Sequence, residues 1–150
     1  MWAEWHLETI VRLSKSEPLA LVLSSSIDTF LDSQGVESKL KNVKREFNHY
    51  LIKDLHADWL AKKKVICSSS AVVHISCFAK VGYFRTDLIK GEDTDLWARL
   101  FENFVFAKTD MVTAFYRTDS SEGNASQSVN SVKKYEVYYF KPQWFVWSSK

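Results

Sequence analysis

Three carboxylates lie within four positions of one short stretch, GEDTDLWARL, which carries the strongest chemical signal of the chain. Glu92, Asp93 and Asp95 repel one another, so their grouping needs a physical reason. Trp97 lies one helical turn beyond Asp93 and would share a helix face with it. A carboxylate beside an indole can hold a sugar, because the carboxylate accepts a hydroxyl proton and the indole offers an apolar surface to the ring.

A plain helix start is the alternative interpretation of the same residues. In that case Asp93 or Thr94 caps the helix, and the positive end of the helix dipole stabilises the acidic side chains. The helix would present one apolar face, formed by Leu96, Trp97, Leu100, Phe101 and Phe104. The residues alone leave the helix start and the sugar site both open.

Hydrophobic periodicity predicts alternating helices and strands around this stretch. Helices are expected over residues 2–18 and 36–55, with a short helical turn over 77–84 that ends at Gly82. Strands are expected over 19–35 and 64–76, and a strand or hairpin over 104–119. A polar loop over 120–131 and an aromatic tail over 133–150 follow. Because no repeat or linker interrupts this order, residues 1–150 are predicted to form a single domain.

The composition is that of a globular protein, with 150 residues, 46% of them hydrophobic and 25% charged. The net charge of +2 is too small for a domain that binds duplex nucleic acid. Cys67 and Cys77 lack the CxxC spacing of a zinc site and are interpreted as reduced thiols, with a single disulfide left open. The N-terminus is unlike a signal peptide, and no apolar run reaches about 18 residues, so a cytoplasmic protein without a transmembrane segment is expected.

GEDTDLWARL resembles the acidic motif of family 2 glycosyltransferases, where a Gly-Glu-Asp-x-Asp-Leu-Trp run opens the helix on the acceptor side of the transfer site. The preceding segment, ICSSSAVVHISCFAKVGYF, is similar to the strand and turn before that motif, although Tyr83 replaces its second glycine. The following segment, FVFAKTDMVTAFYRTDSSEGNAS, resembles the family's next strand, which ends in Tyr-Arg before a polar loop. The three similarities occur in order over about residues 65–130.

This resemblance implies a partial GT-A fold, an α/β architecture with a mixed β-sheet flanked by helices. It also implies an inverting single displacement, in which a general base takes the proton of an acceptor hydroxyl. The hydroxyl oxygen then attacks the anomeric carbon of a nucleotide-sugar, while a divalent cation stabilises the leaving group. By resemblance Asp93 is the base, and Glu92 sets its position and charge.

The resemblance further implies residues that bind the two substrates. The implied acceptor contacts are Trp97, Ser68, Ser69 and Asp95, and the implied donor contacts are Tyr116 and Arg117. Plain structural alternatives stay open for several of them: a core position for the indole, a structural role for the hydroxyls at a strand end, and a solvent-exposed Tyr-Arg pair.

The first residues resemble the tryptophan and helix that follow the Asp-x-Asp metal motif of the family, through Trp2, Leu7, Glu8 and Ile10. In the family that motif and the nucleotide-binding half come earlier in the chain. No metal ligand is therefore assigned here, because the sequence Asp93-Thr94-Asp95 matches the acceptor motif instead. Manganese or magnesium is expected for the complete enzyme, whereas this chain alone is expected to bind no metal and to be inactive.

A non-catalytic remnant that binds a glycan or a partner protein is the second hypothesis, and a structural interaction protein is the third. The aromatic tail would leave apolar surface uncovered, which predicts self-association or a missing N-terminal half. The complete enzyme would use a nucleotide-sugar donor and a glycan acceptor in polysaccharide synthesis, in the cytoplasm or peripherally at the membrane. The sequence does not specify the sugar, the acceptor or the linkage.

Overall fold

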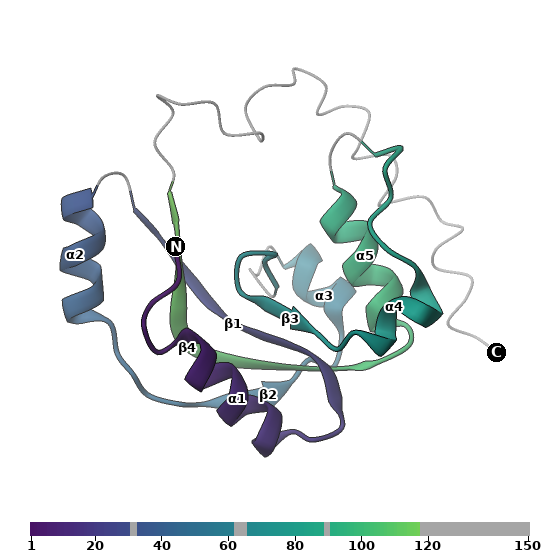
Figure 1. Ribbon diagram of the computed structural model, residues 1–150, viewed down its shortest axis with the longest axis horizontal. Coiled ribbons are helices and arrows are strands. Elements are labelled where there is room, and N and C mark those ends of the chain that lie inside the picture. Colours follow the sequence, from purple (N-terminus) through teal and green to yellow (C-terminus); the bar gives the residue numbers. More distant parts are fainter. Residues whose placement is uncertain (31–32, 62–65, 89–90, 118–150) are drawn as a thin grey trace.

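The computed structural model describes residues 1–30, 33–61, 66–88 and 91–117. The described strands form a mixed four-stranded sheet in the order β2-β4-β1-β3 (Figure 1). Its two long strands, β1 (Ala20–Phe30) and β4 (Val105–Arg117), are parallel neighbours in the centre. The short strands β2 (His49–Leu51) and β3 (Ala71–Val73) run antiparallel to them at the two edges. The predicted α/β architecture with a mixed sheet flanked by helices is therefore confirmed.

One face of the sheet is covered by the three short helices α3 (Leu55–Leu60), α4 (Ser76–Val81) and α5 (Glu92–Phe101) (Figure 1). Val22 of β1 and Phe106 of β4 face this side and pack with side chains of all three helices. Successive side chains of a strand alternate between faces, so the next residues point to the opposite side.

The opposite face is covered by α1 (His6–Ser16). Leu23 and Ala107, which follow Val22 and Phe106, pack there against Ile10 and Leu13 of the helix. The helix α2 (Ser33–Asn42) and the first residues of the chain form a further cluster with the far part of β4. The sheet thus lies between two helical layers. The acidic stretch is the first turn of α5 and belongs to the layer formed by α3, α4 and α5 (Figure 1).

The single helix predicted over residues 36–55 is wrong. Helix α2 ends at Asn42, residues 49–51 form strand β2, and α3 begins only at Leu55. Backbone pairing of β2 with β4 replaces the helical turns there, and Asp54 caps α3 by accepting a hydrogen bond from the Ala57 nitrogen at 2.8 Å. Pairing with β4 supplies the backbone partners of residues 49–51, whereas a helix there would need packing that their exposed side chains do not provide.

The other predicted helices and strands are present, but each is shorter than the predicted range. Helix α1 starts at His6, not at Trp2, which forms an isolated antiparallel bridge to Ala114. Within the described residues 66–76, the expected strand is limited to β3, and residues 33–35 belong to α2 rather than to the first strand. Residues 105–117 form one strand, not a hairpin, and Gly82 ends α4 as predicted. The polar loop over 120–131 and the aromatic tail lie outside the described residues.

Both cysteines are free: Cys77, on helix α4, is buried in the core, and Cys67 is half-buried. Burial raises the pKa of the Cys77 thiol above its usual value. The two residues are therefore unbonded thiols, as the spacing suggested.

Candidate functional site

The acidic stretch forms the first turn of α5, and Gly91 precedes it as the N-cap with a left-handed φ of 76°. The expectation that Asp93 or Thr94 would cap the helix is wrong, because the helix already begins at Glu92, two residues before the start that an Asp93 cap requires. Asp93 Oδ1 instead accepts a hydrogen bond of 2.7 Å from the backbone nitrogen of Thr94, the next residue. The carboxylates still lie at the helix N-terminus, where the dipole favours negative charge.

Asp93 is also held from outside its own helix. The turn at residues 67–70, closed by a hydrogen bond of 2.9 Å from the Ser70 nitrogen to the Cys67 carbonyl, brings Ser68 next to α5. The Ser68 hydroxyl donates to Asp93 Oδ2 at 3.1 Å. Ser68 is exposed and Asp93 is half-buried, so the carboxylate is fixed at two oxygens and still reaches solvent. The structure thus brings together the predicted base and one predicted acceptor contact.

Asp95 has a different environment from Asp93. Its Oδ2 accepts hydrogen bonds from Arg99 Nε at 2.9 Å and Nη2 at 2.7 Å, and Arg85 Nη1 lies 3.9 Å from Oδ1. Arg99 also donates to the carbonyls of Val81 and Tyr83, so this ion pair ties the segment after α4 to helix α5. The Asp95 side chain is only 10% exposed. Its predicted role as an acceptor contact stays a prediction, since both its oxygens already face arginines.

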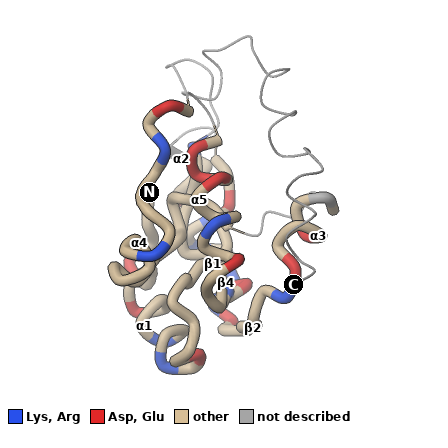
Figure 2. Tube along the Cα trace, turned by 90° about the vertical axis from the view of Figure 1, so that its right-hand side faces the viewer, with Lys and Arg blue, Asp and Glu red and all other residues tan. Residues whose placement is uncertain are grey.

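The three carboxylates therefore differ in function within the fold. Asp95 is used in an ion pair and Asp93 is oriented by a serine, whereas the carboxylate of half-buried Glu92 has no hydrogen bond or ion pair with another described side chain. Figure 2 shows acidic residues at the start of α5, while acidic and basic segments are intermixed over the rest of the described chain.

Trp97 does not offer its indole to solvent. It is 5% exposed and packs in the core with Leu55, Leu100 and Phe106. Its Nε1 is buried and donates no hydrogen bond within the described part of the chain. Trp97 can shape the site only from below, as part of the core on which the first turn of α5 rests.

Trp2 is the exposed indole of this region, and the sequence did not single it out as a site residue. Its Nε1 donates to the Ser69 carbonyl at 2.7 Å, and its ring stacks on His6 with centroids 4.4 Å apart. Ser69 adjoins Ser68, so Trp2 and Asp93 contact consecutive residues of the same turn. The resemblance placed Trp2 at the start of a helix, but nothing local in the sequence indicates its contact with residue 69.

A chain of buried polar groups lies behind Trp2. His6 Nδ1 is 2.6 Å from Thr113 Oγ1, which in turn lies 2.5 Å from Ser25 Oγ. The Ser70 hydroxyl donates to the Ser25 carbonyl at 2.9 Å, which links the chain to the turn that carries Ser68. Burial lowers the pKa of His6, so the imidazole is neutral at pH 7. These bonds fix the turn and the imidazole relative to β1 and β4.

The predicted donor contacts lie elsewhere on the sheet. Tyr116 and Arg117 are the last two residues of β4, opposite Thr29 and Phe30 of β1, and both are exposed. The Asp93 carboxylate accepts hydrogen bonds from Ser68 and Thr94, and the role of Tyr116 and Arg117 in donor binding stays a prediction.

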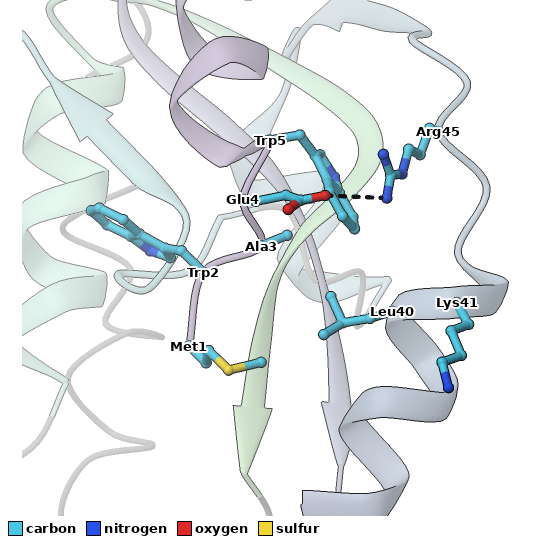
Figure 3. A pocket seen from close by; sticks show the side chains of 8 residues that line it. All are labelled: Met1, Trp2, Ala3, Glu4, Trp5, Leu40, Lys41 and Arg45. Carbon is cyan, nitrogen blue, oxygen red and sulfur yellow. Dashed lines mark ion pairs between the residues drawn. The ribbon is translucent and has the colours of Figure 1, made fainter.

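An open pocket of about 580 Å³ lies between the first residues of the chain and α2 (Figure 3). Its lining consists of Met1, Trp2, Ala3, Glu4, Trp5, Leu40, Lys41 and Arg45. The Arg45 guanidinium stacks over Trp5, with its Cζ 3.8 Å from the ring centroid, and its Nη2 lies 3.7 Å from Glu4 Oε1. Figure 3 shows the Trp2 ring pointing away from Trp5 and Arg45, so Trp2 borders this pocket with its ring turned to the other side.

Within residues 1–30, 33–61, 66–88 and 91–117, no group of three or more His, Cys, Asp or Glu side chains could hold a metal ion. None of the described helices is long and apolar enough to cross a membrane. No protein-family model, curated protein or solved structure matches the chain.

Proposed function

We propose that this chain carries the acceptor side of an inverting family 2 glycosyltransferase with a GT-A type fold, and that Asp93 is its general base. The observation that carries the proposal is the position of Asp93. It lies in the first turn of α5, where the resemblance places the base, and the Ser68 hydroxyl from a separate segment orients it. A carboxylate fixed in this way can accept a proton along a defined direction.

In the proposed reaction the acceptor hydroxyl gives its proton to a carboxylate oxygen of Asp93. The hydroxyl oxygen forms the new bond to the anomeric carbon of the nucleotide-sugar, and the bond from that carbon to the nucleoside diphosphate breaks on the opposite face. Half-buried Glu92, next in the chain, is expected to adjust the charge around Asp93. Tyr116 and Arg117 remain the predicted donor contacts, and manganese or magnesium remains a prediction for the complete enzyme.

Two kinds of measurement test this function. The chain is first titrated by calorimetry with cellohexaose, chitohexaose and maltohexaose, and then with nucleotide-sugars in the presence of manganese. Release of nucleoside diphosphate and the mass of the glycan report transfer. We expect glycan binding by the wild-type chain. In Asp93→Asn we expect binding to persist while any transfer falls by about 10²–10⁴-fold, which is the usual contribution of a general base.

Glu102→Gln is the matched control, because Glu102 is an exposed carboxylate directly after the other end of α5. It should leave both binding and transfer unchanged. Glycan binding without transfer under any donor would favour the alternative of a non-catalytic glycan-binding module. Absence of binding to every glycan, or a measurable transfer rate that is equal in Asp93→Asn and wild type, would contradict the proposed acceptor site.

A further inference from the structure

Trp2 is a large exposed side chain that is nevertheless held at two points. Trp2 is 54% exposed. Its Nε1 donates a hydrogen bond of 2.7 Å to the Ser69 carbonyl, and one face of its ring stacks on His6 with an interplanar angle of 22°. An indole that is fixed at its N–H and backed on one face has lost most of its rotamer freedom. A ligand that packs on the exposed part of the ring therefore loses little entropy from ordering it.

The support beneath the ring is itself ordered. His6 is 1% exposed, and its Nδ1 lies 2.6 Å from the hydroxyl of Thr113 in the centre of β4. The residue that the ring rests on is therefore anchored to a central strand of the sheet and not to a loop. Sites positioned on strands keep their geometry better than sites on loops alone.

Polar groups suited to a sugar lie on the turn to which this ring is bonded. Ser68 and Ser69 are consecutive in the turn, with Cα atoms about 3.8 Å apart. Ser69 holds the indole through its carbonyl, while Ser68 holds the carboxylate of Asp93. The Ser69 hydroxyl makes no hydrogen bond to another residue of the described ranges. An apolar ring face next to hydroxyls and a carboxylate matches a pyranose, which has an apolar C–H face and hydroxyls at its edge.

We infer that Trp2 is the stacking platform for a pyranose ring of the acceptor glycan. The C–H face of that sugar packs on the indole, and its hydroxyls are directed to the turn and to Asp93. This inference rests on the proposed function and replaces buried Trp97 with exposed Trp2 as the aromatic element of the acceptor site. Trp2 is a binding residue in this scheme, and it takes no proton.

The test compares glycan binding by Trp2→Ala, Trp2→Phe and a control, using the same three hexasaccharides and calorimetry. Tyr83→Ala is the control, because Tyr83 is 70% exposed and stacks on Phe78 in a comparable way, with centroids 5.2 Å apart. We expect Trp2→Ala to weaken binding by at least about tenfold, since stacking of a ring on an aromatic side chain is lost. Trp2→Phe keeps an aromatic face and should weaken binding less, and Tyr83→Ala should have no effect.

Thermal unfolding of each variant separates loss of the platform from loss of the fold. Weaker binding by Trp2→Ala at an unchanged melting temperature, with Trp2→Phe intermediate, supports the platform. Binding within twofold of wild type in Trp2→Ala, or an equal loss in Tyr83→Ala, overturns it. If Trp2→Ala is neutral while Asp93→Asn abolishes transfer, the platform fails and the proposed function stands. If the wild-type chain binds none of the three glycans, both fail.

Discussion

The hydroxyl of Ser68 donates a hydrogen bond of 3.1 Å to Oδ2 of Asp93, although 25 positions separate the two residues in the sequence. The other carboxylate oxygen is fixed locally, because the Thr94 nitrogen donates to Oδ1 at 2.7 Å. One bond thus comes from the helix itself and the other from the turn before β3. The orientation of Asp93 depends on both segments, which makes the turn part of the site.

The bond between Ser68 and Asp93 should be measurable as a coupling energy. In a double-mutant cycle with Ser68→Ala and Asp93→Ala, each of which removes the hydrogen bond, we expect the two variants to be non-additive by about 0.5–1.5 kcal/mol in the free energy of unfolding. The exposure of Ser68 keeps the value in this modest range. Urea unfolding of the four proteins gives the coupling directly. Additive effects would show that the serine does not orient the carboxylate.

The ion pair of Asp95 with Arg99 should contribute more to stability than the exposed ion pair of Asp87 with Arg85. Asp95→Asn removes a charge that receives two hydrogen bonds from Arg99 and is 10% exposed, so we expect a loss of about 1–3 kcal/mol. Asp87→Asn is the control, because Asp87 is exposed and pairs with Arg85 in solvent, where ion pairs contribute little. Chemical denaturation measures both variants. A loss of glycan binding in Asp95→Asn without any loss of stability would instead support the predicted acceptor role.

Helix α5 could be predicted from the sequence because its local signals agree with its tertiary environment. The apolar spacing of Leu96, Trp97 and Leu100 predicts a buried face, and all three are buried in one cluster. The acidic residues before them fit the positive end of the helix dipole. Where the apolar period, the helix dipole and burial agree, the sequence is sufficient to predict the helix, although it did not predict Gly91 as the cap.

The site around Trp2 could not be predicted because it depends on contacts distant in the chain. Trp2 donates to residue 69 and pairs with Ala114, and neither contact leaves a local pattern. The same reason explains the missed strand β2, whose residues 49–51 have helical spacing but pair with β4. For Trp97 the local pattern was informative, because its helical spacing predicted the apolar face of α5 correctly. The indole on that face is buried, so it cannot contact an acceptor directly.

The two faces of α1 should differ sharply in their response to truncation. Leu13 is fully buried between the helix and the sheet, so Leu13→Ala should cost about 2–5 kcal/mol through lost burial and a cavity. Leu7 lies in the same helix and is 61% exposed, so Leu7→Ala should change the free energy of unfolding by less than about 0.5 kcal/mol. Thermal and urea unfolding report both values. Equal losses would contradict the packing of α1 on the sheet.

Buried His6 should make stability fall as the pH is lowered below about 6.5, the usual pKa of histidine. Burial lowers the pKa of His6 in the folded chain, so the unfolded chain takes up a proton first as the pH falls. Stabilisation by neutral His6 is therefore complete above the unfolded pKa and is lost progressively down to the lower folded pKa. The slope from this single group can reach about 1.4 kcal/mol per pH unit.

Urea unfolding between pH 7.5 and pH 5.5 tests this linkage, above the range in which ordinary carboxylates titrate. His6→Asn removes the titrating group, so its stability curve should be flatter than that of the wild type over this range. His74→Asn is the matched control, because His74 is exposed and its ring is hydrogen-bonded to nearby Ser76. It should keep the wild-type slope. Parallel curves for wild type and His6→Asn would mean that the imidazole beneath Trp2 is as accessible to protons in the folded chain as in the unfolded one.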